Sequence, residues 1–200
     1  MKNEICNFQT HTVNYLNRLN SCFNKEIISQ IEKLSDDLLN TWIKNNQVFL
    51  AGNGGSAANA MHIANDLHYG VGACGLGEKI PGIKVEALPA NPGIITCLGN
   101  DTGYENIFSH QLKVKANEND LLVALSGSGN SPNIIKALEI GKQLKMKTYA
   151  ILAYDGGKSL DLADEVIHFP INDMQIAEDT QLIIGHTCMQ WLNTHKPQRG

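Results

Sequence analysis

The sequence predicts an α/β fold in which a doubly wound, five-stranded parallel sheet carries helices on both faces and follows a helical arm. The first observation is a set of five short apolar segments, at 48–51, 83–88, 120–125, 147–152 and 166–169. Uninterrupted apolar runs of this length are typical of parallel strands that are buried on both faces. The second observation is that helical segments alternate with these runs, which favours right-handed crossovers in a single sheet.

The segments between the strands show helical spacing of apolar residues. The expected helices cover about residues 57–67, 94–98, 103–115, 134–144, 160–163 and 174–193, and the glycine-rich stretch 70–82 is expected to be a loop or lid. Residues 1–45 predict two further helices with a break at 21–24, where cap-type residues cluster. We therefore expect a helical arm at 1–45 and one globular unit at 46–200. The long apolar stripe of the arm favours a subunit interface.

Composition narrows the class of partner. The 200 residues are 42% apolar with a net charge of −4, which indicates a folded globule and gives no reason to expect a nucleic-acid partner. Arg18 and Arg199 are the only arginines, so a phosphate bound centrally would depend on hydroxyls, backbone N–H groups and lysine. The five cysteines form no CxxC pair, which is typical of a protein in a reducing compartment. No signal peptide and no apolar run of membrane-spanning length is visible. The sequence therefore predicts a cytoplasmic protein without a membrane partner.

The first expected strand leads into a turn that suits an anion. Asn53, Gly54 and Gly55 form this turn, and Ser56 stands where we expect the N-cap of the next helix. Glycines let the backbone approach a phosphate, and the free N–H groups and dipole of a helix N-terminus favour negative charge. The turn lacks the GK[ST] of a Walker A loop and departs from the GxGxxG dinucleotide pattern.

A second polar turn, SGSGNS, follows the third strand and supplies Ser126, Ser128 and Ser131. One such turn is as well explained by the capping of a helix. Carboxyl ends of parallel strands face a shared crevice, so two such turns favour a phosphate site between them.

The helix after the first turn also carries His62 and Asp66. The two residues are four apart, which places both side chains on one helical face. This spacing indicates a metal or acid–base pair.

Three segments together, AGNGGSAANAMHIA, GNDTGYENIFSHQL and LSGSGNSPNIIKAL, resemble the sugar isomerase (SIS) domain family. Within it the sequence is most similar to the bacterial phosphoheptose isomerases, along essentially the whole chain. The resemblance implies an SIS fold of the flavodoxin-like type, a homotetramer that commonly binds zinc, and conversion of sedoheptulose 7-phosphate to D-glycero-D-manno-heptose 7-phosphate.

The resemblance also implies site residues. The family's His-x-x-x-Glu and its Gln eight residues before a His correspond here to His62, Asp66, Glu178 and His186. The family glutamate is the shorter Asp66, and the family glutamine is the charged Glu178. Imidazole and carboxylate are ordinary zinc ligands, so these four residues are the expected ligands of one zinc per subunit. Asp101, in GNDTGYE, is expected to contact the substrate or to have a structural role in the crevice.

Isomerisation through an enediol needs a general base, and an acid or metal that steadies the oxyanion. Asp66 or Glu178 is the candidate base, with His186 as the acid or as its partner. The serines expected to anchor the phosphate are Ser56, Ser126, Ser128 and Ser131. Alternatives are another phosphosugar, or a non-catalytic SIS adaptor that associates with the replication initiator and lacks the metal residues. A sugar-phosphate sensor is disfavoured, because no basic helix–turn–helix precedes the SIS region.

Overall fold

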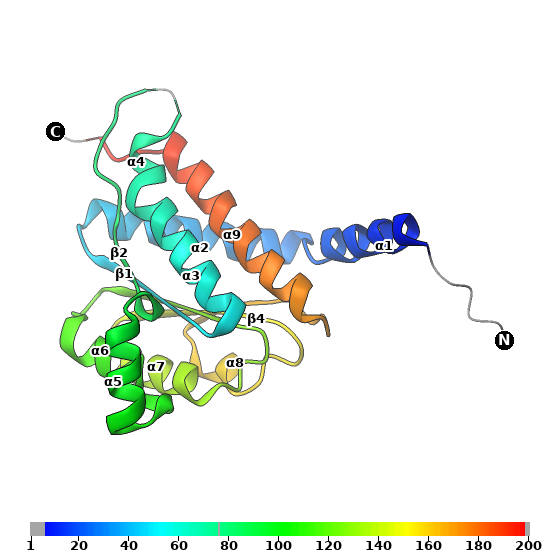
Figure 1. Cartoon of the computed structure of the whole chain (residues 1–200). Coiled ribbons are helices and arrows are strands. Elements are labelled where there is room, and N and C mark those ends of the chain that lie inside the picture. Colours follow the sequence, from blue (N-terminus) through cyan, green and yellow to red (C-terminus); the bar gives the residue numbers. More distant parts are fainter. Residues whose placement is uncertain (1–6, 76, 199–200) are drawn as a thin grey trace.

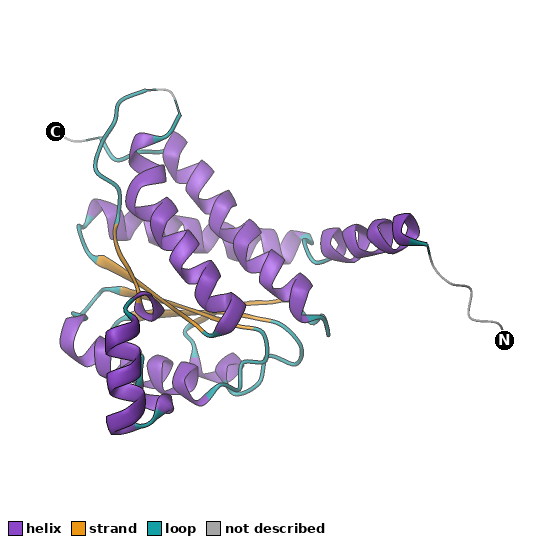
Figure 2. Cartoon of the chain, in the orientation of Figure 1, coloured by secondary structure: helices purple, strands orange, loops and turns teal. Residues whose placement is uncertain are grey.

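The structure, a computed structural model, describes residues 7–75 and 77–198. Its five strands form one entirely parallel sheet in the order β2-β1-β3-β4-β5, as the sequence predicts (Figures 1 and 2). The strands are β1 (Gln47–Gly52), β2 (Lys84–Ala87), β3 (Leu121–Ser126), β4 (Lys147–Leu152) and β5 (Glu165–His168). This is the strand order of the flavodoxin-like doubly wound sheet.

Helices cover both faces of the sheet, as predicted (Figure 1). One face carries α2 (Lys25–Ile43), α3 (Gly54–Asn65), α4 (Val71–Ala73) and α9 (Met174–Thr194), and the other carries α5 (Pro92–Thr102), α6 (Ser109–Lys115), α7 (Pro132–Gln143) and α8 (Ser159–Leu162). Each face has its own apolar core, and β1 contributes to both. Val48 and Leu50 belong to one core and Phe49 and Ala51 to the other. Successive side chains of a strand point to opposite faces, which explains the uninterrupted apolar run.

The predicted arm divides into two helices with different environments. α1 (Phe8–Ser21) projects away from the sheet and buries none of its described residues (Figure 1). Two polar contacts join it to the start of α9: Tyr15 donates to Asp179 at 2.5 Å, and Arg18 pairs with Asp173 at 2.7 Å. α2, in contrast, is part of the core. The break between α1 and α2 is confirmed, whereas residues 1–6 of the arm, and Arg199, lie outside the described residues.

Several predicted boundaries are wrong. The first site helix begins at Gly54 with Asn53 as its N-cap, so Ser56 lies inside the helix. The α-helix ends at Asn65 and continues as a π-helical turn, η1 (Asp66–Gly70), followed by α4, which occupies part of the expected loop 70–82.

The expected helix at 103–115 is divided as well. Gly103, with φ of 92°, ends α5, which is longer than the predicted 94–98. The 3-10 turn η3 (Tyr104–Asn106) then precedes α6; a second 3-10 turn, η2 (Leu88–Ala90), follows β2. None of the described helices has the length and apolar character needed to cross a membrane. The four described cysteines are free.

Candidate active site

The two polar turns meet at one pocket of about 270 Å³. It lies where β1 and β3 end, which is the point at which the strand order reverses and where such sheets bind ligands. Seven of the eight predicted substrate-binding residues line it: Asn53, Gly54, Gly55, Ser56, Ser126, Ser128 and Ser131. Glu178 and Met174, from the start of α9, complete the lining together with Leu125 and Gly127. The two turns therefore lie together at one pocket, as expected for the carboxyl ends of neighbouring parallel strands.

Two hydroxyl groups of the second turn accept backbone N–H groups and are free to donate their own protons. Ser126 Oγ accepts the N–H of Gly129 at 3.1 Å, and Ser128 Oγ accepts the N–H of Asn130 at 3.3 Å. A serine hydroxyl has one proton and two lone pairs, so a hydroxyl that accepts a backbone N–H keeps its proton to donate. The turn thus offers donors to a ligand rich in acceptor oxygens, such as a phosphate.

The loop between β4 and α8 supports this turn from outside. Ser159 donates to the carbonyl of Gly129 through its N–H at 3.0 Å and its hydroxyl at 2.7 Å. Gly129 has a φ of 63°, and a Cβ at this position would overlap the carbonyl oxygen of Gly156. The close packing of two loops therefore requires glycine here.

Asn53, at the entrance of α3, is held by two residues that the sequence does not single out. Its side chain exchanges hydrogen bonds with Asn133, donating at 2.9 Å and accepting at 2.8 Å. Tyr104 also donates to Asn53 Oδ1, at 3.1 Å. Asn133 is the second residue of α7 and is 1% exposed. Its burial, which the sequence does not show, explains why sequence reasoning missed it.

A second group of polar side chains lies further along α3 and α9. His62 Nε2 is 3.0 Å from His186 Nε2, and Asp66 Oδ2 is 3.6 Å from each of these nitrogen atoms. Asp66 and His62 share one face, as their spacing predicts, although Asp66 belongs to the π-helical turn. Asp66 Oδ2 is buried and has no hydrogen-bond partner among the described residues.

The three residues fit a divalent cation. Zinc bonds of about 2.0–2.2 Å in tetrahedral geometry separate neighbouring ligand atoms by about 3.3–3.5 Å. The observed separations, from 3.0 to 3.6 Å, bracket this value. A bound cation would also satisfy the buried oxygen of Asp66, which otherwise carries a desolvation cost.

Two predicted residues are not in the groups to which the sequence assigns them. The carboxylate of Glu178 lies against Gly55, where a Cβ would overlap it, and Glu178 is outside the His62–Asp66–His186 group. Asp101 is exposed on α5, accepts a bond from Asn100 at 2.7 Å and does not line the pocket.

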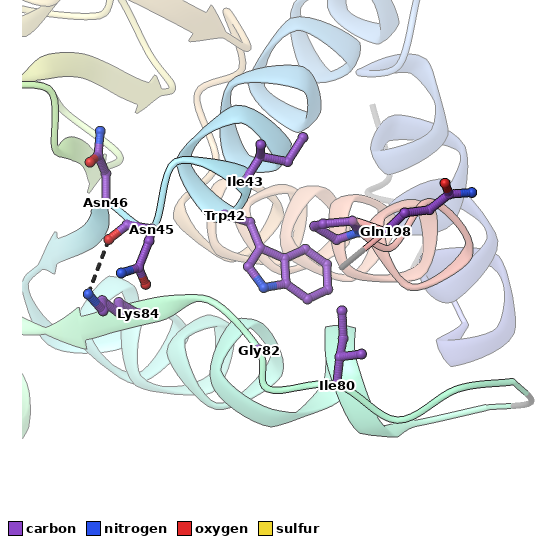
Figure 3. A pocket seen from close by; sticks show the side chains of 9 residues that line it. Trp42, Ile43, Asn45, Asn46, Ile80, Gly82, Lys84 and Gln198 are labelled. Atoms are coloured by element: carbon purple, nitrogen blue, oxygen red, sulfur yellow. Dashed lines mark hydrogen bonds between the residues drawn. The ribbon is translucent and has the colours of Figure 1, made fainter. Parts of the chain in front are cut away.

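A groove of about 450 Å³ lies at the opposite edge of the sheet, where β1 and β2 begin (Figure 3). Trp42 and Lys84 line it, but the indole N–H donates to the carbonyl of Pro81, and the ammonium donates to the carbonyl of Asn45. None of the predicted site residues reaches this groove. The chemistry-bearing residues gather instead at the carboxyl edge of the sheet and along α3 and α9.

The chain belongs to the SIS domain family, which it matches over residues 13–153. It is similar to the phosphoheptose isomerase of Aneurinibacillus thermoaerophilus, with 36% identity over 162 residues that cover 81% of this chain and 79% of the relative. It is 38% identical to the phosphoheptose isomerase of Aliarcobacter butzleri, over 80% of this chain and 82% of the relative.

The fold is also that of solved phosphoheptose isomerases. The Francisella tularensis enzyme superposes with a TM-score of 0.85 at 22% identity, over 93% of this chain and 96% of the other. The Neisseria gonorrhoeae enzyme gives 0.83 at 23% identity, with the same coverage of both chains.

Proposed function

We propose that the protein is a phosphoheptose isomerase that interconverts sedoheptulose 7-phosphate and D-glycero-D-manno-heptose 7-phosphate. The named activity of its relatives supports this reaction. The observation that carries it is the distance between the two halves of the site. α3 and α9 lie side by side and run in the same direction (Figure 1). The serine-lined pocket lies at the start of both helices, and the His62–Asp66–His186 group lies further along them.

That distance suits a long phosphosugar. Gly55 meets Glu178 at the pocket, and His62 meets His186 at the second group, seven residues further along α3 and eight along α9. At 1.5 Å per residue, these levels are about 10–12 Å apart. An extended heptose 7-phosphate has eight bonds between C1 and phosphorus and spans about 10 Å at ~1.2 Å per bond. A triose phosphate, with four such bonds, would reach about half as far.

In this arrangement the serine turn binds the phosphate and places C1 and C2 beside Asp66. We assign Asp66 as the base that moves the proton between the two carbons, and His186 as the acid that protonates the oxygen. Glu178, the other carboxylate considered, lies at the phosphate end and is too far along α9 for this step. Binding energy from the remote phosphate then orients the reacting carbons.

We also propose one zinc per subunit, held by His62, Asp66 and His186. A divalent cation there would supply a Lewis acid for the developing oxyanion and would take the place of His186 as the acid, because a ring nitrogen that binds zinc cannot also donate a proton. The matching ligand separations and the unpartnered Asp66 oxygen support this assignment. Glu178, expected from the resemblance as a fourth ligand, would have to leave its place beside Gly55 to join them.

The assembly proposed is a cytoplasmic homotetramer without nucleic-acid or membrane partners. Support for self-association comes from α1, where Phe8, Val13 and Leu16 are at least half exposed. Apolar side chains in a row on a projecting helix favour burial against another subunit.

Turnover of sedoheptulose 7-phosphate by the purified protein tests the proposal. Asp66→Asn should lower kcat about 10²- to 10⁴-fold, the usual contribution of a general base. Ser128→Ala should mainly raise KM. Asp161→Asn, which changes an exposed carboxylate on α8, is the matched control and should leave both constants unchanged. Full activity of Asp66→Asn would contradict the assignment of the base.

A further inference from the structure

We propose that Asn133 is a positioning residue that keeps the first turn of α3 open for the phosphate, by preventing Asn53 from capping its own helix. The inference rests on the proposed function, because it concerns the same pocket. It explains why a buried asparagine links the two turns.

Among the described residues, four other helices are capped by the side chain of their N-cap residue. Asn7, Asn24, Asn91 and Asp173 are N-cap residues, and each side chain accepts an N–H from the first turn of its helix. Asn53 is the N-cap of α3 in the same extended conformation, with φ of −115° and ψ of 151°, yet its side chain makes no capping bond. A side chain that caps well elsewhere in this chain is therefore used differently at the pocket.

The hydrogen bonds of Asn53 explain the difference. Capping requires Oδ1 to accept the N–H of the second or third helical residue, here Gly55 or Ser56. Oδ1 already accepts from Asn133 at 2.8 Å and from Tyr104 at 3.1 Å, and an amide oxygen has two lone pairs. The second bond of the pair, from Asn53 Nδ2 to Asn133 at 2.9 Å, fixes the orientation of the amide. Asn53 is thus held away from the N–H groups of α3.

The consequence for a ligand is direct. The first-turn N–H groups of a helix need an acceptor, and a side-chain cap competes for them with a bound anion. Gly55 and Ser56 both line the pocket, together with the hydroxyl groups of Ser126 and Ser128. By holding Asn53, Asn133 leaves these N–H groups to the phosphate.

Loss of Asn133 should therefore weaken phosphate binding by allowing Asn53 to become a cap. A side-chain cap favours the capped state of a helix N-terminus by a factor of about five to ten. Because phosphate would have to displace this cap, Asn133→Ala should weaken the binding of inorganic phosphate by about the same factor. The affinity would be measured by phosphorus NMR titration. Hydrogen exchange of the segment that contains Gly55 and Ser56 should slow in the ligand-free variant, because these N–H groups gain a partner.

A second substitution distinguishes two explanations of weaker binding in Asn133→Ala, namely capping of α3 by Asn53 and a general loss of stability in the turn. Asn53→Gly in the Asn133→Ala background removes the competing cap, and phosphate affinity should return to that of Asn53→Gly alone. Tyr104→Phe, at a 57% exposed residue, removes one donor to Asn53 Oδ1 but leaves both bonds to Asn133 in place, so phosphate affinity should stay unchanged. If Asn133→Ala does not fold, Asn133→Leu, which keeps about the same side-chain size and loses both bonds to Asn53, should weaken binding instead. Asn24→Ala, which removes a true cap from α2, should lower stability and leave phosphate affinity unchanged.

The outcomes distinguish the two proposals. Wild-type protein that binds phosphate, with the folded Asn133 variant binding it equally well, would overturn the role of Asn133 alone. A weakening by Tyr104→Phe as large as that by the Asn133 variant would assign the orientation of Asn53 to Tyr104 and would overturn it too. Failure of Asn53→Gly to restore affinity in the double variant would also overturn it. Wild-type protein that does not bind phosphate, or binds it equally after Ser128→Ala, would overturn the phosphate pocket and this inference with it.

Discussion

Substitution of Gly129 by alanine tests whether the serine turn depends on close packing of two loops. Gly129 and Gly54 both have positive φ, 63° and 55°, so alanine at either position carries the left-handed strain of about 1–2 kcal/mol. Their surroundings differ. A Cβ at Gly129 would overlap the backbone carbonyl of Gly156, whereas a Cβ at Gly54 would have no atom within 4 Å.

The comparison of the two variants isolates the overlap. Forcing a methyl group against a fixed backbone costs about 1–3 kcal/mol, so Gly129→Ala should lose about 2 kcal/mol more than Gly54→Ala. With a urea m-value of about 2 kcal/mol/M, this difference appears as a separation of about 1 M in the unfolding midpoints. Both variants should be unfolded at the same protein concentration, because self-association makes the midpoint depend on it.

Equal midpoints for the two variants would mean that a methyl group at Gly129 meets no unfavourable overlap, since the strain from positive φ is common to both. The additional loss in Gly129→Ala should be accompanied by weaker phosphate binding, because Ser128 is its neighbour in the turn.

Three further changes test contacts outside the candidate site. Burial opposes ionisation of Asp164, but the hydroxyl and N–H of Thr148 donate to it and hold its pKa below the usual value. The contribution of the ionised Asp164 to the free energy of unfolding is present above about pH 4 and is lost as the pH falls through the lowered pKa. Asp164→Asn should therefore lower the free energy of unfolding at pH 7, and the difference from the wild type should shrink as the pH is lowered. Tyr149→Phe, which removes the hydroxyl that donates to Asp37 at 2.6 Å, should cost about 2 kcal/mol in urea unfolding. Leu16→Glu should dissociate the proposed tetramer in sedimentation velocity.

Each of these has a contradicting result. If the difference in free energy of unfolding between the wild type and Asp164→Asn were constant from pH 7 to pH 3, the charge of Asp164 would not be involved. Unchanged unfolding of Tyr149→Phe would mean that the buried hydroxyl is not stabilising. For α1, Asn17→Glu adds the same charge at an exposed polar position and should leave the assembly intact; dissociation by both variants would indicate charge repulsion rather than loss of an apolar contact.

The sheet could be predicted because β1 and β3 are buried on both faces. Every residue of β3 is buried, so the apolar run appears in the sequence without any knowledge of its neighbours. The break between α1 and α2 could also be predicted, because Asn24 accepts the N–H of Ile27, three residues along the chain, and so caps α2. The first residues of the helices near the pocket were harder to predict. Ser56 has the chemistry of an N-cap, but a turn that begins with Asn53 and Gly54 satisfies the same preferences two to three residues earlier.

The site was predictable where its geometry is local. His62 and Asp66 are related by one helical turn, and their proximity follows from spacing. The position of Glu178 does not follow from the sequence, because it depends on how α9 packs against α3 at Gly55. The bonds from Asn133 and Tyr104 to Asn53 join residues 80 and 51 positions apart, and neither partner carries a pattern that names the other.

We expect this chain to isomerise a seven-carbon phosphosugar at a site that includes His62, Asp66 and His186. The most direct measurement is to purify the protein without a metal-binding tag, quantify bound metal, and follow product formation from sedoheptulose 7-phosphate. We predict turnover, about one zinc per chain, and loss of both in His62→Ala. A protein with neither metal nor turnover would contradict the proposed function and favour a non-catalytic SIS adaptor.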